Sequence, residues 1–202
     1  MDCMELMKEF PDKYFDLAIV DPPYGIKGLK KNHGHLSKYG DISKANNAVP
    51  NKQYFSELFR VSKNQIIWGG NYFAMPKCRC FVCWFKHQPL NNYSDCEYAW
   101  TSFEKPAKVF DYPYFGSINA EPNRIHPTQK PVALYRWLLK KYAQEGDIIL
   151  DTHVGSASSL IACYQMGFTY VGSELDKEFF DKATERLENE KSQIRFEDLE
   201  AI

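Results

Sequence analysis

The chain has 202 residues, of which 44% are hydrophobic and 25% are charged, a composition typical of a globular protein with one large core. The formal net charge of −1 excludes a uniformly basic surface, so affinity for nucleic-acid phosphates must come from local clusters of lysine and arginine. No apolar run approaches the roughly 20 residues that cross a bilayer, so we expect an intracellular, cytoplasmic protein without membrane contacts.

The most informative predicted element is the strand Phe15–Val20, which ends at Asp21. Its run of Phe, Ile and Val is typical of a parallel strand buried on both faces. Two prolines follow Asp21, and they lack the N–H groups that a continuing strand needs. The Asp21 carboxylate therefore lies at the carboxyl edge of the predicted sheet, where open α/β folds bind their ligands, with Tyr24 three residues further on.

These residues suit the exocyclic amino group of a nucleobase. Such an amine is a poor nucleophile, because its lone pair is delocalised into the ring. The Asp21 carboxylate can accept one N–H and the Pro22 carbonyl the other, in a turn made rigid by Pro23, so that the lone pair faces an electrophile. Tyr24 can stack on the base, an interaction worth about 1–3 kcal/mol in single-strand binders. The alternative is a proline turn with a capping aspartate and no catalytic role.

A lysine-rich segment, residues 27–52, follows Tyr24 directly. Asp41 is its one acid, and its basic residues are Lys27, Lys30, Lys31, Lys38, Lys44, Lys52, His33 and His35. Its position beside the predicted base site favours a lid that contacts substrate phosphates. A solvated linker is the alternative.

The other predicted elements give an α/β layout throughout. A short amphipathic helix precedes the first strand, and a second helix opens at Pro50. In chain order, the predicted elements after Pro50 are strands over 65–68, Phe81–Phe85, 97–102, 109–112 and 147–151, a helix over 156–166 and a strand over 169–173.

The cysteines offer a zinc site as an alternative reading of the middle of the chain. Cys78, Cys80, Cys83 and Cys96 provide enough ligands in number. Strand alternation, however, sends Cys80 and Cys83 to opposite faces. We therefore expect reduced thiols and no metal.

The last strands and helix are typical of a nucleotide-cofactor site. Gly155 lies in the turn between a strand and a helix, where backbone N–H groups can approach a ligand closely. The next strand ends at Glu174, and an acid at that place commonly binds ribose hydroxyls. Taken alone, this pattern fits a nicotinamide cofactor as well as S-adenosylmethionine.

Together these motifs resemble the permuted, beta-type group of the D-P-P-Y family of DNA amino-methyltransferases, in which the catalytic half precedes the cofactor half. The resemblance covers nearly the whole chain and includes Asp2 and Cys3 and residues 21–24, 66–73, 126–131 and 151–156. It implies a Rossmann-like S-adenosylmethionine-dependent α/β fold with a mostly parallel central sheet. The single domain, 1–202, would comprise a catalytic half at 1–70, a target-recognition region at 71–125 and a cofactor-binding half at 126–202.

The resemblance also implies roles for individual residues. Asp21, Pro22, Pro23 and Tyr24 would be catalytic. Asp151, Gly155 and the backbone around them would hold the methionine part of the cofactor, and Glu174 the ribose. The residues expected near the cofactor are Asp2, Thr128, Lys130, Asp151, Thr152, His153, Gly155, Ser156, Ala157 and Glu174. Within this set, Thr128 and Lys130 would lie near its carboxylate and Asp2 near its adenine amino group; a surface lysine in the first turn of a helix is the alternative for Lys130.

The chain departs from the family pattern at three points. Ala157 stands where a second glycine is usual, which a negative φ would tolerate, and His153 stands where an aromatic residue is common. The strand that usually precedes the acid at Asp2 is missing, and residues 193–196 are a candidate to replace it.

The predicted reaction is transfer of the methyl group of S-adenosylmethionine to a flipped base in DNA by direct in-line displacement, without a covalent enzyme intermediate. Adenine N6 is preferred, because cytosine enzymes of the family more often carry serine at the position of Asp21. The alternatives are N4-cytosine methylation, RNA adenine methylation and a regulatory module that binds nucleotides without catalysis. A homodimer is left open, since family members are often dimers.

Overall fold

The computed structural model describes residues 1–26, 49–88, 90, 93–115, 118–119, 121 and 124–193. Most of the predicted lid, 27–48, lies outside the described residues. The same holds for residues 194–196 of the tail that we expected to replace a missing strand.

The core of the protein is a seven-stranded sheet in the order β5-β3-β4-β2-β1-β6-β7. Strands β1, β2, β6 and β7 form one parallel block, whereas β4 runs antiparallel to both β2 and β3. The strands are β1 (Phe15–Val20), β2 (Ser62–Trp68), β3 (Phe81–Phe85), β4 (Cys96–Thr101), β5 (Lys108–Asp111), β6 (Ile148–Asp151) and β7 (Thr169–Gly172). The predicted Rossmann-like α/β fold with a mostly parallel sheet is confirmed.

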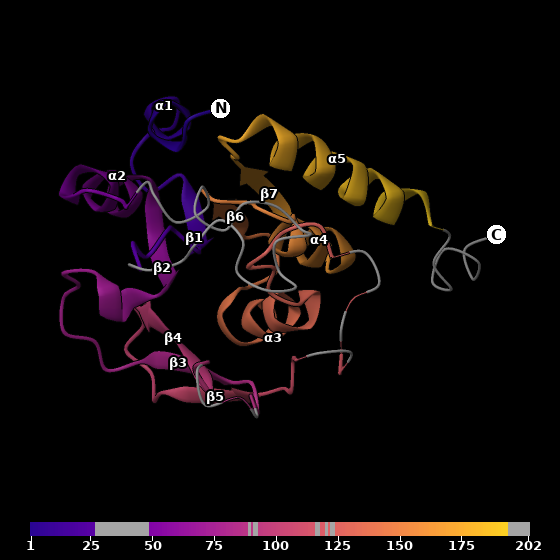
Figure 1. Cartoon of the computed structure of the whole chain (residues 1–202). Coiled ribbons are helices and arrows are strands. Elements are labelled where there is room, and N and C mark those ends of the chain that lie inside the picture. The colour runs from indigo at the N-terminus through magenta and orange to yellow at the C-terminus, as the bar shows by residue number, and fades with distance from the viewer. Residues whose placement is uncertain are drawn as a thin grey trace.

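Helices cover both faces of this sheet (Figure 1). Helices α1 (Cys3–Lys8) and α2 (Lys52–Val61) pack on one face, against Ala18 and Val20 of β1. Helices α3 (Val132–Tyr142) and α4 (Ser158–Gln165) pack on the other face, which includes Leu17 and Ile19. Strand β1 is thus buried on both sides, as its Phe, Leu, Ile and Val residues predict. Helix α5 (Lys177–Ser192) packs on α4, and η3 (Gly70–Tyr72) is a single 3-10 turn after β2.

The loop before α4 differs from the predicted one. The helix begins at Ser158, two residues later than expected, because Gly155 and Ala157 have φ angles of +53° and +63°. The negative φ that would tolerate a methyl at Ala157 is therefore not found. Both positions adopt the left-handed conformation that favours glycine, and Ala157 does so while fully buried.

We expect Ala157→Gly to change the free energy of unfolding by less than about 1 kcal/mol. Relief of left-handed strain, about 1–2 kcal/mol for an L-residue, offsets the loss of a buried methyl, about 0.8 kcal/mol, and the added freedom of the unfolded chain, about 0.4–1 kcal/mol. Ala162 is a matched control, because it is equally buried but lies inside α4. Ala162→Gly should cost about 2 kcal/mol, the sum of a lost methyl and a lost helix former. Equal losses in urea denaturation of the two variants would contradict the left-handed assignment.

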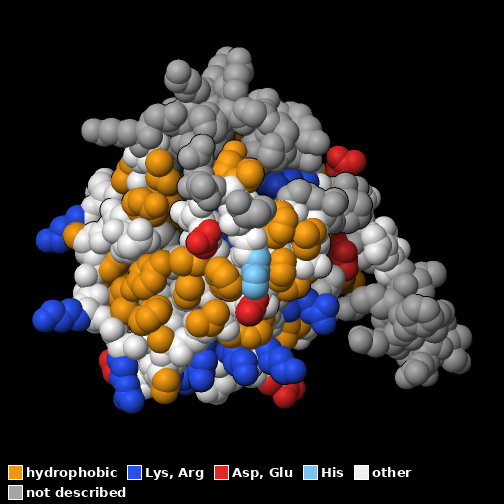
Figure 2. Space-filling view, turned by 60° about the horizontal axis from the view of Figure 1, so that its bottom comes forward, with side chains coloured by type: hydrophobic (Ala, Val, Ile, Leu, Met, Phe, Trp, Pro, Cys, Tyr) orange, Lys and Arg blue, Asp and Glu red, His pale blue; other side chains and the backbone are white. Residues whose placement is uncertain are grey.

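The outer strands leave apolar side chains on the surface. Phe81 and Phe85 of β3 are about two-fifths exposed, and Val109 of β5 more so. Figure 2 shows hydrophobic side chains gathered on this side of the molecule, with lysine and arginine side chains along the lower rim of the view. Cys80 is buried while Cys83 lies on the other face of β3, as the alternation predicted.

Neither a metal-binding cluster nor a membrane-spanning helix occurs among the described residues. In that part of the chain, no group of three or more His, Cys, Asp or Glu side chains is arranged to hold a metal ion. Nor is any described helix both long enough and apolar enough to span a membrane.

Candidate active site

The parallel strands bring the predicted site residues to one edge of the sheet. Strands β1 and β6 are direct neighbours, with Ala18 opposite Leu150. Asp21, just after β1, and Asp151, the last residue of β6, therefore lie at adjacent strand ends. Strand β7 lies beside β6 and leads to Glu174. Residues from the two halves of the chain therefore meet at the carboxyl ends of the strands.

Asp21 is held by two side chains. Its Oδ1 accepts a hydrogen bond from the hydroxyl of Tyr24 at 2.5 Å. Its Oδ2 lies 2.5 Å from the ammonium of Lys130, which is 109 residues away in the sequence. Burial, followed by the negative charges of Asp21 and Glu97, raises the pKa of Tyr24 well above its usual value, so its phenol remains a donor at neutral pH.

Lys130 is not the surface lysine of the alternative reading, and its expected place near the cofactor carboxylate stays a prediction. It is 5% exposed, so it is not a surface lysine. Its ammonium pairs with Asp21 and also with Oε2 of Glu97 at 3.0 Å. Burial works to lower the pKa of Lys130, but the two carboxylates outweigh it and raise the pKa.

The Tyr24 ring is already stacked in this structure. It lies parallel to the ring of Tyr72, with centroids 5.0 Å apart and an interplanar angle of 11°. A β-carbon on Gly69 would lie 2.1 Å from Cε1 of Tyr24, so the ring sits here only because Gly69 has no side chain. Tyr72 is half exposed. A base that stacks on this face of Tyr24 therefore requires Tyr72 to move aside.

Asp151 is a buried acid without a cationic partner. It is 2% exposed, and its carboxylate accepts hydrogen bonds from Oγ of Ser159 and from the backbone N–H of His153. No Lys or Arg side chain of the described part of the chain forms an ion pair with it. Burial is the main reason that the pKa of Asp151 is raised to about 7. A cation bound beside Asp151 would pair with the negatively charged form of this carboxyl group.

The loop between β6 and α4, residues 152–157, is held by side chains of α2 and α5 as well as by its own. Oγ1 of Thr152 lies 2.7 Å from the hydroxyl of Tyr54 and 2.9 Å from Nδ1 of His153. The His153 ring packs edge-on against Tyr54, and burial lowers the pKa of His153 to about 4. At the other end of the loop, Arg186 of α5 donates to the Ser156 carbonyl at 2.6 Å. The loop geometry is therefore set by packing and not by the glycine alone.

Glu174 and the N-terminus lie next to this loop. Oε2 of Glu174 accepts a hydrogen bond from the N–H of Gly155 at 2.9 Å. The amino group of Met1 donates to the Glu174 carbonyl at 2.9 Å, which brings Asp2 into the same region. Asp2 is exposed and caps α1 by accepting from the N–H of Met4. Its expected contact with adenine stays a prediction.

The segment 126–131 joins the two parts of the site. His126 is buried against Phe179, and a β-carbon on Gly155 would lie 3.8 Å from its ring. Burial is the first reason that the pKa of His126 is lowered to about 4, so it is neutral at physiological pH. Thr128 is exposed and hydrogen-bonded to Nδ1 of His126. Lys130, two residues later, reaches the Asp21 side of the site.

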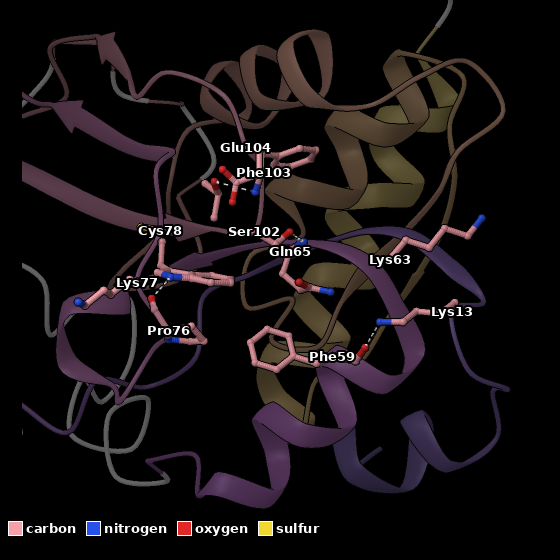
Figure 3. A pocket seen from close by; sticks show the side chains of 12 residues that line it. Lys13, Phe59, Lys63, Gln65, Pro76, Lys77, Cys78, Ser102, Phe103 and Glu104 are labelled. Atoms are coloured by element: carbon pink, nitrogen blue, oxygen red, sulfur yellow. Dashed lines mark hydrogen bonds between the residues drawn. The ribbon is translucent and has the colours of Figure 1, made fainter.

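A cavity of about 330 Å³ lies elsewhere, among residues at the opposite edge of the sheet (Figure 3). It includes Lys63 and Gln65, at the start of β2, whereas Trp68 at the other end of β2 lies beside Lys130. Two of its lysines are engaged: Lys13 donates to the Phe59 carbonyl at 2.6 Å, and Lys63 pairs with Asp16. The predicted site residues Asp21, Asp151 and Glu174 do not line this cavity.

Sequence reasoning missed the residues that support the site from a distance. Glu97 of β4 binds Lys130, and its second oxygen pairs with Lys86 at 3.0 Å. Glu121 accepts from the N–H of Val132 at the start of α3 and from Arg186. Nothing in the spacing of these residues signals such contacts, because the partners lie far apart in the chain.

The fold and this edge of charged and aromatic side chains define a Rossmann-like methyltransferase. The family model described as DNA methylase matches residues 62–185. The chain belongs to this family of S-adenosylmethionine-dependent DNA amino-methyltransferases, whose acceptors are adenine N6 or cytosine N4.

Individual relatives are distant but extend over most of the chain. Type II methyltransferase M.HpaI of Haemophilus parainfluenzae is 24% identical and aligns with 94% of this chain and 73% of its own length. Type II methyltransferase M2.MboI of Moraxella bovis is 25% identical, covering 92% of this chain and 85% of its own.

Solved structures show the same fold. The M1.HpyAVI–SAM complex superposes with a TM-score of 0.60 at 22% identity, over 92% of this chain and 96% of that one. The cytosine-N4-specific PvuII DNA methyltransferase gives a TM-score of 0.57 at 13% identity, over 94% and 89%.

Proposed function

We propose that this protein methylates adenine N6 in DNA, with Asp21, Pro22, Pro23 and Tyr24 acting on the target amine. The observation that carries the proposal is the Asp21 carboxylate, held at the carboxyl edge of β1 by Tyr24 and Lys130 and adjacent to the acidic end of β6. Membership of the DNA methylase family supports the reaction class.

Asp21 would orient the lone pair of the amine. An ionised carboxylate has about four lone-pair positions, of which Tyr24 and Lys130 occupy two. Those that remain can accept an N–H of the base, and the Pro22 carbonyl can accept the other. The lone pair then faces away from the protein acceptors and toward the bound methyl donor. The base must leave the duplex to reach this position.

The donor set at the ends of β6 and β7 fits S-adenosylmethionine. When bound, this cofactor supplies a methyl group on a cationic sulfonium. Asp151 offers a buried carboxylate without a cationic partner to its positively charged methionine part, and Glu174 offers carboxylate oxygens to ribose hydroxyls. We propose that Thr152, His153, Gly155, Ser156 and Ala157 line the cofactor site, with Asp2 and Thr128 at its ends. Lys130 would reach the cofactor only by leaving Asp21 or Glu97.

The choice of adenine rests on Asp21, where cytosine enzymes of the family more often have serine. The fold does not distinguish the two bases, because the cytosine-specific PvuII enzyme shares it. The test is incubation with labelled S-adenosylmethionine and duplex DNA or RNA, followed by mass spectrometry of the nucleosides. We expect N6-methyladenine from DNA. N4-methylcytosine, or labelled RNA alone, would overturn the proposal, and cofactor binding without transfer to any nucleic acid would indicate a regulatory module.

We expect Glu174→Ala to weaken S-adenosylmethionine binding by about 10-fold to 100-fold, because a charge-assisted hydrogen bond contributes about 1.5–3 kcal/mol. The variant also removes the acceptor of the Gly155 N–H, so Glu174→Gln, which keeps one acceptor oxygen, should lose less. Asp181→Ala, on the exposed side of α5, is the control and should bind normally. Unchanged affinity of Glu174→Ala by titration calorimetry would remove Glu174 from the cofactor site.

A further inference from the structure

The cluster around Lys130 connects four charged side chains from separate parts of the fold. Asp21 follows β1, Lys130 precedes α3, Glu97 belongs to β4 and Lys86 follows β3. The nitrogen–oxygen distances are 2.5 Å between Lys130 and Asp21, 3.0 Å between Lys130 and Glu97, and 3.0 Å between Lys86 and Glu97. Two carboxylates and two ammonium groups balance each other, which allows charge in a poorly solvated place.

The Lys130 ammonium has three donors, and three acceptors surround it: Asp21, Glu97 and, at 3.4 Å, the Tyr24 hydroxyl. It also lies 5.3 Å from the ring centroid of Trp68 and 5.8 Å from that of Tyr24. Its position is therefore defined from several sides. Without Glu97, the ammonium would lose one of its two carboxylate partners.

We propose that Glu97 and Lys130 are positioning residues for Asp21: Glu97 holds the Lys130 ammonium, and the ammonium fixes the carboxylate that receives the target amine. The inference deepens the proposed function and rests on the role of Asp21 in it. Neither residue touches the reacting atoms in this scheme. Lys86 completes the cluster by binding the second oxygen of Glu97.

The electrostatics of Glu97 agree with this arrangement. Burial works to raise the pKa of Glu97, but the charges of Lys130 and then Lys86 lower it to about 2. Glu97 is thus ionised throughout the physiological range and presents a permanent charge to Lys130. The alternative is that Lys130 blocks Asp21 until Lys130 moves away. In that case the ion pair between Lys130 and Asp21 would inhibit the reaction.

Glu97→Gln tests the inference, because it keeps the shape of the side chain and removes its charge. A displacement of about 1 Å at a reacting group can cost on the order of 100-fold, so we expect kcat on DNA to fall by about 10-fold to 100-fold. The dissociation constant of S-adenosylmethionine should stay within about twofold, since the pair acts on Asp21 and not on the cofactor. Glu97→Asp should restore part of kcat.

The double variant Glu97→Gln with Lys130→Met tests whether a loss of kcat in a single variant comes from a destabilised fold. It leaves Asp21 and Lys86 as balanced charges, whereas Lys130→Met alone leaves two carboxylates without Lys130. If the residues act as one unit, kcat of the double variant should be no lower than that of the poorer single variant. Lys63→Gln, which breaks the surface pair with Asp16, is the matched control and should be as active as wild type.

The carboxyl ¹³C resonance of Asp21, assigned with Asp21→Asn, gives a readout that requires no methyl transfer. It should shift in Glu97→Gln and not in Lys63→Gln. An unmoved resonance with full kcat would overturn the inference, as would higher kcat in the double variant or a tenfold loss of cofactor affinity in Glu97→Gln. If wild-type protein methylates no nucleic acid, the proposed function fails, while the resonance still decides whether the pair positions Asp21.

Discussion

Replacing Asp21 with alanine is expected to reduce methyl transfer by on the order of 10²–10³-fold or more, the usual cost of removing a group aimed at the reacting centre. The carboxylate is assigned to the substrate amine, so the affinity for S-adenosylmethionine should stay within a few fold. The measurement is single-turnover transfer to duplex DNA together with calorimetric titration of the cofactor. Retention of a tenth of wild-type turnover would remove Asp21 from the catalytic role.

Asp21→Asn is the matched control for this experiment. The Asp21 carboxylate pairs with the buried ammonium of Lys130, so alanine leaves that charge with Glu97 alone and is expected to destabilise the protein as well. Asparagine keeps the shape and one acceptor oxygen for Tyr24 while removing the charge. If catalysis needs the carboxylate itself, both variants lose turnover; if only packing matters, Asp21→Asn retains it.

The position of Asp21 could be predicted from local patterns, because the residues that form a strand and end it lie within a few positions of each other. The apolar run of β1 and the prolines after it fix where Asp21 lies, and the ends of β1 and β3 agree with the prediction. Lys130 could not be placed in this way. Its partners Asp21 and Glu97 become its neighbours only through the order of the strands in the sheet. A lysine just before a helix is expected to be exposed when its partners are unknown.

Ala157 shows a second limit of sequence reasoning. Alanine favours the right-handed helical region, so the residue itself predicts an earlier helix start than the structure has. Helix α5 is not among the predicted elements, although it has a recognisable start. Asp176 caps it by accepting from the N–H groups of residues 178 and 179, and Ala183 and Leu187 follow at helical spacing on the buried side.

The buried acid Asp151 predicts a pH-dependent gain in stability for Asp151→Asn. Because the pKa in the folded protein, about 7, is higher than the ordinary value of 3.8, folding favours the protonated form. The stability contributed by the protonated acid is fully present below about pH 4 and is lost as the pH rises to about 7. A pKa that is higher by about three in the folded protein corresponds to a loss of on the order of 4 kcal/mol in the free energy of unfolding. Asparagine cannot ionise, so this loss disappears in the variant.

The expected effect is therefore in the difference between the unfolding free energies of Asp151→Asn and wild type, and not in the pH dependence of either protein alone. His126 and His153 have lowered pKa values, so they contribute stability above about pH 6.5 that is lost toward pH 4, opposite in sign to Asp151. Both histidines are present in each protein and largely cancel. The free energy of unfolding of Asp151→Asn minus that of wild type, from urea denaturation, should rise between pH 4 and pH 7 and then level off.

Cofactor binding gives an independent check on the same carboxyl group. If Asp151 receives the cationic methionine part of S-adenosylmethionine, it must ionise on binding, so wild-type protein should release close to one proton near pH 6. Calorimetry in two buffers of different ionisation enthalpy measures this release. Asp151→Asn should bind more weakly and release none. A flat stability difference together with no proton release in wild type would show that Asp151 is already ionised and bonded to Ser159 and the His153 N–H alone.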